Sequence, residues 1–158
     1  MNTERLAALG AALQARAQWL AVAESCTGGL LAARLTDVPG ASGWFDRGLV
    51  TYANRAKVAL LGVPATLIET HGAVSAEVAQ AMARGLRAGA GVDWTIAVTG
   101  VAGPGGGTAA KPVGTVWVAW EGPAVSEMRL LRLQGDRDAI RQQTVVQALQ
   151  GLHDYVTL

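Results

Sequence analysis

The sequence predicts an α/β protein in which a mixed β-sheet lies between two layers of helices, as a three-layer α/β/α sandwich. Three observations lead to this prediction. Segments with the apolar spacing of helices alternate with short apolar runs of strand length. The last two runs, at residues 113–120 and 128–133, are joined by a short turn and read as a hairpin. A length of 158 residues favours one domain over residues 1–158 and is enough to bury a substantial core.

The first half of the chain is expected to contain two strands and three helices. Leu6, Leu9 and Leu13 recur at helical spacing and predict a helix over about residues 2–17. The elements expected next are a strand at 19–23, a tight turn at 24–29, a helix at 30–35 and a strand at 49–52. Asn54 is the expected N-cap of the following helix, which runs through Lys57.

The second half begins with a short segment after Pro64. Ser75 is expected to cap a helix that carries Val78, Met82 and Leu86 on one face. A strand at 94–99 runs into a glycine-rich loop, and the hairpin follows it. Asp136 is expected to cap the last helix. The apolar stripe of that helix consists of Ile140, Val145, Ala148, Leu149, Leu152 and Val156.

Composition excludes several classes of protein. The net charge of +1 gives no basic surface for nucleic acid or an anionic membrane, and no apolar run approaches the ~20 residues of a membrane span. The apolar run at 19–23 is too short for the core of a signal peptide, so the cytoplasm is the expected compartment. Hydrophobic residues reach 51% while charged residues are only 16%, which predicts a homo-oligomer that covers part of the apolar surface.

The sequence offers no metal-ligand pattern. Cys26 is the only cysteine, so an internal disulfide is impossible. The only histidines, His71 and His153, are far apart in sequence. We therefore expect neither a metal nor another cofactor.

Ser25 is the first candidate for chemistry, because it lies where a strand turns into a helix. A side chain there is exposed at the carboxyl end of the sheet, and the main-chain N–H groups of Thr27, Gly28 and Gly29 could form an oxyanion hole. The alternative is a plain helix cap, which the spacing alone favours because the G-x-S-x-G elbow is absent. Cys26 is a rival nucleophile, although a small buried filler is the commoner role of such a residue.

Lys57 is the candidate general base for such a serine. In the first turn of a helix capped by Asn54, its ammonium faces the positive end of the helix dipole, which should lower its pKa. A partly neutral lysine can take a proton from serine. Tyr52 could orient the pair through its hydroxyl or simply pack. The alternative for Lys57 is a solvated surface residue.

Two further features suggest an anion site. In the glycine-rich loop, the N–H groups of residues such as Gly100, Gly103, Gly105 and Gly106 could form a nest for phosphate or ribose. The loop matches neither the Walker A nor the dinucleotide motif, so a flexible connection between strands is the alternative.

Arg137 and Arg141 form the second feature. They lie one turn apart at the start of the last helix, where cations are unfavourable unless an anion binds. Charge balance with the neighbouring Asp136 and Asp138 explains the same arginines equally well.

Six stretches together resemble the CinA C-terminal domain family, the nicotinamide-nucleotide amidohydrolases. They follow family order over nearly the whole chain, which makes the resemblance far more specific than any single motif. The stretches are residues 23–29 (AESCTGG), 51–54 (TYAN) with Lys57, 71–75 (HGAVS), 99–106 (TGVAGPGG), 111–114 (KPVG) and 135–137 (GDR) with Arg141.

The resemblance implies an enzyme that converts nicotinamide mononucleotide and water to nicotinate mononucleotide and ammonia, without a cofactor. It implies that Ser25 and Lys57 are catalytic, and Tyr52, Thr99 and Arg137 match further positions of the family's site. A nucleotide-binding or adaptor module that uses the same pocket without turnover is the alternative function.

The chain departs from the family pattern in two respects. Arg55 and Ala110 stand where acidic residues are expected, at what we expect to be surface positions. Many relatives also carry an amino-terminal domain that resembles molybdopterin-binding proteins. We expect none here, so the activities of that domain are not transferred.

Overall fold

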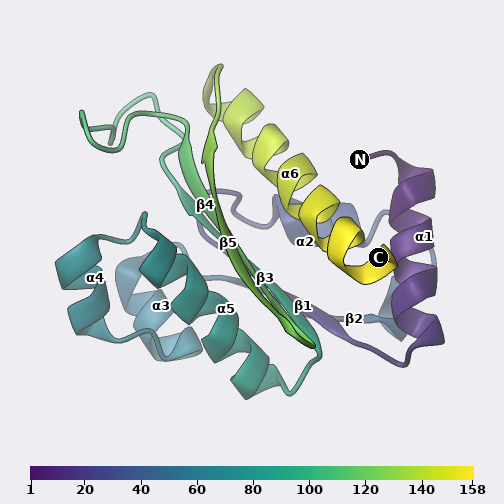
Figure 1. Ribbon diagram of the computed structural model, residues 1–158. Helices are drawn as coiled ribbons and strands as arrows, with labels where there is room; N and C mark the ends of the chain where they lie inside the picture. The colour runs from purple at the N-terminus through teal and green to yellow at the C-terminus, as the bar shows by residue number, and fades with distance from the viewer.

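The computed structural model describes residues 1–158 and confirms the mixed sheet between two helical layers (Figure 1). The sheet has five strands in the order β2-β1-β3-β4-β5. β1 (Leu20–Glu24) pairs in parallel with both β2 (Phe45–Val50) and β3 (Trp94–Gly100). β4 (Thr115–Gly122) runs antiparallel to β3 and forms the hairpin with β5 (Val125–Arg132).

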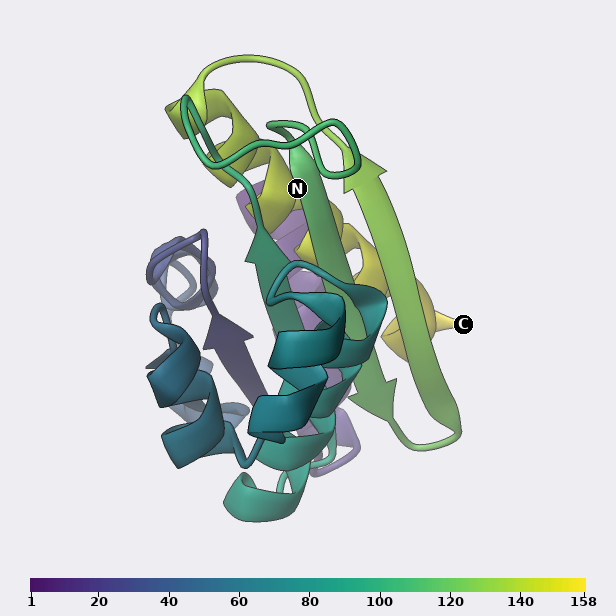
Figure 2. The same cartoon turned by 90° about the vertical axis from the view of Figure 1, so that its left-hand side faces the viewer.

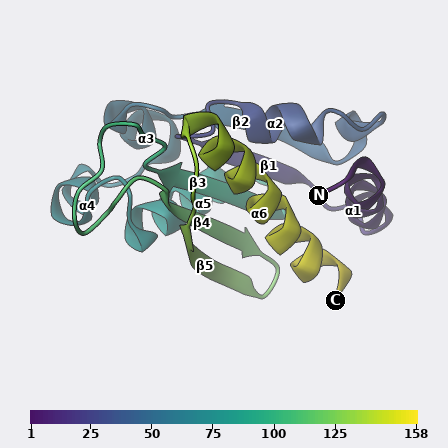
Figure 3. The ribbon, with the colours of Figure 1, turned by 90° about the horizontal axis from the view of Figure 1, so that it is seen from above.

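The helices cover both faces of the sheet (Figures 1 and 3). One layer contains α1 (Thr3–Ala15), α2 (Leu30–Leu35) and α6 (Arg137–Thr157). The other contains α3 (Asn54–Leu61), α4 (Ala65–His71) and α5 (Ala76–Ala90), and the short 3₁₀ helix η1 (Ala41–Gly43) precedes β2. No helix combines the length and the apolar character that crossing a membrane requires.

Two hydrophobic cores lie on opposite faces of the sheet. Successive side chains of a strand point to opposite faces, so Leu20 and Val22 of β1 enter the core beneath α1, α2 and α6, while Ala21 and Ala23 enter the core beneath α5. β1 is therefore buried on both faces, which explains the continuous apolar run from Leu20 to Ala23. The predicted stripes of α5 and α6 are confirmed, since all of their residues are buried.

The predicted element boundaries are wrong in three places. β2 begins four residues earlier than predicted, because it is an edge strand whose exposed Asp46 and Arg47 hide its pattern. The hairpin turn is tighter than expected, with only Pro123 and Ala124 between the strands. α3 has Ala53 as its N-cap, without a side-chain hydrogen bond, and Asn54 is its first helical residue rather than its cap.

Candidate active site

A cleft of about 310 Å³ opens at the carboxyl ends of β1 and β3. From β1 the chain passes through α2 to β2, and from β2 through α3–α5 back to β3 on the other side of β1. The strand order thus reverses between β1 and β3, which is where open α/β sheets bind ligands. Figure 2 shows the glycine-rich loop, residues 101–114, arching past the tip of β3 beside the start of α6. The cleft is lined by Ser25, Cys26, Tyr52, Asn54, Lys57, Ala73, Val74, Thr99, Gly100, Val101, Ala102, Gly103, Gly105, Gly106 and Arg137.

The structure brings Ser25 and Lys57 together. Ser25 directly follows β1 and Lys57 lies in the first turns of α3, yet Nζ of Lys57 is 3.0 Å from Oγ of Ser25. The other two partners of Nζ are the carbonyl oxygens of Thr51, at 2.9 Å, and Tyr52, at 3.1 Å. A neutral amine has two N–H groups and one lone pair, so donation to both carbonyls leaves the lone pair for the hydroxyl proton of Ser25.

Burial lowers the pKa of Lys57. The side chain is only 1% exposed and forms no ion pair with a carboxylate, so removal of its ammonium from water is not compensated. The direction of the predicted shift is confirmed, but its cause differs from the prediction. Desolvation is the leading cause rather than the helix dipole, and the alternative of a solvated surface lysine is excluded.

Cys26 also lines the cleft, but its environment opposes reactivity. The thiol is 4% exposed, and burial raises its pKa to about 11. A main-chain hydrogen bond and the nearby Arg141 guanidinium only partly oppose that rise. The thiol therefore stays protonated at neutral pH, and a thiol is a much weaker nucleophile than a thiolate.

The turn after Ser25 uses two of the three N–H groups that were predicted to form the oxyanion hole. Gly28 N–H donates to the Ser25 carbonyl at 3.0 Å, and Gly29 N–H donates to the Glu24 carboxylate at 3.2 Å. Both glycines have positive φ, +57° and +106°, which explains why the turn requires glycine. Thr27 N–H has no acceptor in the chain, but Thr27 does not line the cleft. The predicted set of Thr27, Gly28 and Gly29 is therefore corrected.

Arg137 connects three parts of the cleft. Its guanidinium donates to the carbonyl of Gly103 at 2.7 Å and to the hydroxyl of Tyr52 at 2.8 Å. Tyr52 is 56% exposed, so its ring stands at the mouth of the cleft rather than in the core. Thr99, at the end of β3, donates its hydroxyl to the carbonyl of Ala73 and so fixes the segment before α5.

The glycine-rich loop forms one wall of the cleft. Gly100, Gly103, Gly105 and Gly106 all line it, as the predicted anion nest requires. The N–H groups of Ala102, Gly103, Gly105 and Gly106 donate to no acceptor within the chain. Ala102 and Gly103 are buried at the base of the loop, whereas Gly105 and Gly106 are exposed. The loop thus offers free main-chain N–H donors both at its buried base and in its exposed part.

Arg141 does not take the predicted place in the cleft. Its guanidinium donates to the carbonyl of Cys26 at 3.0 Å and to that of Thr27 at 3.1 Å. One turn of α6 separates it from Arg137, and this is enough to direct it at the Ser25 turn instead. The spacing of the two arginines could not distinguish a ligand contact from a contact with the protein's own main chain.

Sequence reasoning missed several residues of the site. Glu24, Ala73, Val74 and Ala102 were given no role, and Asn54 only that of a helix cap, although they line the cleft or contact its main chain. The signal for Glu24 was available, because a carboxylate just before a helix start can accept N–H groups there. The two departures from the family pattern, at residues 55 and 110, are exposed as expected.

The charges of the cleft are all of one sign. Lys57 and Arg137 are its ionisable cationic residues, and no Asp or Glu side chain lines it. No group of three or more His, Cys, Asp or Glu side chains comes together anywhere in the structure. The cleft therefore suits a ligand that carries negative charge.

The fold and site define an α/β/α protein with a buried serine–lysine pair at its topological switch point. Residues 2–156 match the family model of the CinA C-terminal domain, and the chain belongs to that family. A nicotinamide-nucleotide amidohydrolase PncC of Enterobacter agglomerans is 50% identical over 153 residues, covering 94% of this chain and 92% of that protein. Another of the same name, from Pseudomonas putida, is 56% identical over 132 residues, covering 82% of this chain and 81% of that protein.

Longer relatives and solved structures agree with this membership. A CinA-like protein of Geotalea daltonii is 58% identical over 133 residues, covering 84% of this chain and 32% of that protein. The chain thus spans about a third of the length of the CinA-like relatives from Geotalea daltonii and Geobacter sulfurreducens. A crystal structure of a CinA superfamily protein from Klebsiella pneumoniae superimposes with a TM-score of 0.93 at 39% identity, covering 99% of both chains.

Proposed function

We propose that this chain hydrolyses the carboxamide of nicotinamide mononucleotide, giving nicotinate mononucleotide and ammonia, with Ser25 as nucleophile and neutral Lys57 as general base. The observation that carries the mechanism is the 3.0 Å contact between Oγ and a buried Nζ whose other partners are two carbonyls. The names of two relatives at 50% and 56% identity support the reaction. A module that only binds nucleotides has no use for such a pair.

The cleft supports a phosphate-bearing amide as the substrate. With Lys57 neutral, Arg137 is the cationic side chain of its lining, and no Asp or Glu side chain lines it to repel a phosphate. We assign the phosphate to Arg137 and to the exposed N–H groups of Gly105 and Gly106. A ligand held there extends its carboxamide toward Ser25 on the opposite side of the cleft, so that remote binding energy orients the amide.

In the first half of the reaction, Oγ of Ser25 attacks the amide carbon while Lys57 takes the hydroxyl proton. Negative charge develops on the carboxamide oxygen. We assign its stabilisation to the buried N–H groups of Ala102 and Gly103, which have no acceptor in the chain, together with that of Cys26, the residue after the nucleophile. The C–N bond then breaks, and Lys57 returns its proton to the leaving nitrogen, which departs as ammonia.

In the second half, water replaces ammonia. Lys57, neutral again, takes a proton from a water molecule as its oxygen attacks the ester carbon of the nicotinoyl-Ser25 intermediate. The ester bond breaks, the proton passes from Lys57 to Oγ, and nicotinate mononucleotide leaves. The two halves balance to one water consumed and one ammonia released.

Ammonia release tests the proposal. The protein is incubated with nicotinamide mononucleotide and, separately, with nicotinamide riboside, nicotinamide, glutamine and asparagine. We expect rapid release from the mononucleotide and far slower release from compounds without the phosphate. Tight binding of the mononucleotide without ammonia would instead identify a binding or adaptor module. Release from all amides alike would contradict the proposed substrate.

A further inference from the structure

Glu24 is a buried carboxylate that the proposed mechanism does not use. It ends β1, immediately before Ser25, and its side chain is fully buried without an ion-pair partner. Its two oxygens accept three main-chain N–H groups at the start of α2, from Gly29 at 3.2 Å, Leu31 at 2.8 Å and Ala32 at 3.0 Å. A carboxylate in this position satisfies donors that a helix start leaves free and complements the helix dipole.

The main chain of Glu24 extends these contacts to the general base. Its carbonyl accepts Thr51 N–H at 2.8 Å, and the Thr51 carbonyl in turn accepts Nζ of Lys57 at 2.9 Å. Glu24 therefore contacts the turn that carries the nucleophile through its side chain and the segment that holds the base through its backbone.

Arg141 holds the same turn from α6. Its guanidinium donates to the carbonyls of Cys26 and Thr27, the two residues after Ser25. The segment after Ser25 thus gives three N–H groups, from Gly29 and the start of α2, to an anionic side chain and two carbonyls to a cationic one. Charge-assisted hydrogen bonds are short and directional, so this pair restricts the turn from two sides.

We propose that Glu24 and Arg141 are positioning residues that together hold Oγ of Ser25 within reach of Nζ of Lys57. This inference rests on the proposed function for its substrate. Displacement of a reacting group by about 1 Å can cost a hundredfold in rate, so loss of either contact should lower kcat rather than weaken substrate binding.

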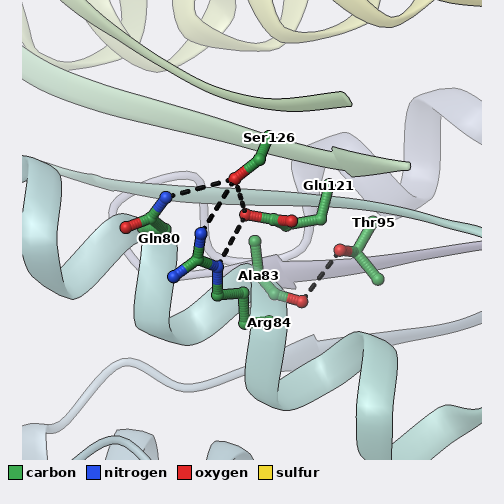
Figure 4. A network of polar contacts seen from close by, with 6 residues as sticks. All are labelled: Gln80, Ala83, Arg84, Thr95, Glu121 and Ser126. Atoms are coloured by element: carbon green, nitrogen blue, oxygen red, sulfur yellow. Dashed lines mark hydrogen bonds and ion pairs between the residues drawn. The ribbon is translucent and has the colours of Figure 1, made fainter. Parts of the chain in front are cut away.

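Glu24→Gln is the primary test. The amide keeps the size of the side chain but turns one acceptor oxygen into an NH₂ group that faces N–H donors. Glu121→Gln is the matched control, because Glu121 is also a buried carboxylate but contacts Arg84 and Ser126 far from the cleft (Figure 4). We expect Glu24→Gln to lower kcat about ten- to a hundredfold with KM within about twofold, and Glu121→Gln to leave both constants unchanged. Melting temperatures of both variants show how much of any loss comes from stability.

Arg141→Lys is a second variant, which tests the positioning role even if Glu24→Gln does not fold. A lysine cannot donate to both carbonyls in the fixed fork of a guanidinium. We expect a lower kcat with an unchanged KM. A raised KM with an unchanged kcat would mean that Arg141 binds the substrate, and it would overturn the proposal.

Labelling of Ser25 by a fluorophosphonate separates this proposal from the proposed function. The probe forms an Oγ–P bond and releases fluoride without needing the natural substrate, and mass spectrometry follows the rate. Slower labelling of Glu24→Gln than of Glu121→Gln supports positioning even if the parent releases no ammonia from nicotinamide mononucleotide. Equal labelling rates and equal kcat values for these two variants would overturn it and leave the proposed function standing.

Discussion

The two ends of the sheet each place a serine hydroxyl beside a buried ionisable group, with different results. At one end, Ser25 contacts Lys57, whose remaining partners are neutral carbonyls. At the other, Ser126 donates to Glu121 at 2.7 Å and accepts from Arg84 and Gln80, while Arg84 also pairs with Glu121 (Figure 4). The second cluster balances its charges and fills its hydrogen bonds. The first also fills its hydrogen bonds, but no carboxylate pairs with Lys57.

This difference is the one that the proposed mechanism requires. In the Glu121 cluster the buried carboxylate has a cation beside it, and the Arg84 side chain reaches solvent. Lys57 is buried without an anion, and its pKa falls because the charged form is penalised. A base that is neutral near working pH needs such an uncompensated site. The predictions below test whether this contrast, rather than proximity alone, determines reactivity.

The largest expected effect is the loss of Ser25. Ser25→Ala should lower kcat for ammonia release by about 10⁴ to 10⁶, as removal of a nucleophile does in a serine protease. Ser126→Ala, the matched change in the other cluster, should leave kcat unchanged. Cys26→Ala should stay within roughly tenfold of the parent, because its buried thiol remains protonated. A greater loss from Cys26→Ala than from Ser25→Ala would make Cys26 the nucleophile.

Substitution of Lys57 should have the next largest effect. Lys57→Arg should lower kcat by about 10² to 10⁴, the usual contribution of a general base, because a guanidinium keeps its proton at working pH. An arginine variant with near-parental kcat would show that only the positive charge matters.

The pH profile of the parent tests the state of Lys57 directly. Only the neutral amine accepts a proton, so activity should rise with pH through the lowered pKa of Lys57 and level off above it. The rise should therefore be complete well below the pKa of a free lysine. A rate that fell as pH increased over this range would mean that the ammonium is the active form.

Loss of Arg137 should have an intermediate effect that depends on the substrate. Arg137→Ala should raise KM for nicotinamide mononucleotide about ten- to a hundredfold, which corresponds to about 1.5–3 kcal/mol for a hydrogen bond to a charged group. Some loss of kcat should follow, because phosphate binding also orients the amide. Nicotinamide riboside is the control, and its poor turnover should barely change. If Arg137→Ala changed the kinetic constants equally for both compounds, Arg137 would instead support the positions of Tyr52 and the glycine-rich loop.

The smallest expected effect is that of chelation. The serine–lysine route needs no metal ion, so prolonged dialysis against a strong chelator should leave kcat unchanged. Activity that disappears on dialysis and returns with one divalent ion would overturn this prediction. The melting temperature, measured on the same samples, should not move either.

Much of the fold could be predicted because local patterns report burial. The stripe from Ile140 to Val156 has helical spacing, and residues 20–23 are all apolar because β1 is buried on both faces. β2 gave a misleading pattern, since an edge strand needs few apolar residues. Lys57 was proposed as the base for Ser25 from its position in a first helical turn, and the family resemblance added that both are catalytic. Their contact could not be derived, because spacing along the chain reveals nothing of the distance between two residues 32 positions apart.

The sequence by itself determined the alternation of helices and strands, the glycine turn after Ser25 and the absence of any metal-ligand pattern. Each of these depends on residues that are neighbours in the chain. Only the tertiary structure decided that Glu24 takes the N–H groups offered by Gly29, that Arg141 turns to the main chain while Arg137 lines the cleft, and that burial lowers the pKa of Lys57. Hydrogen-bond partners and desolvation depend on what packs around a group, and distant parts of the chain supply that packing.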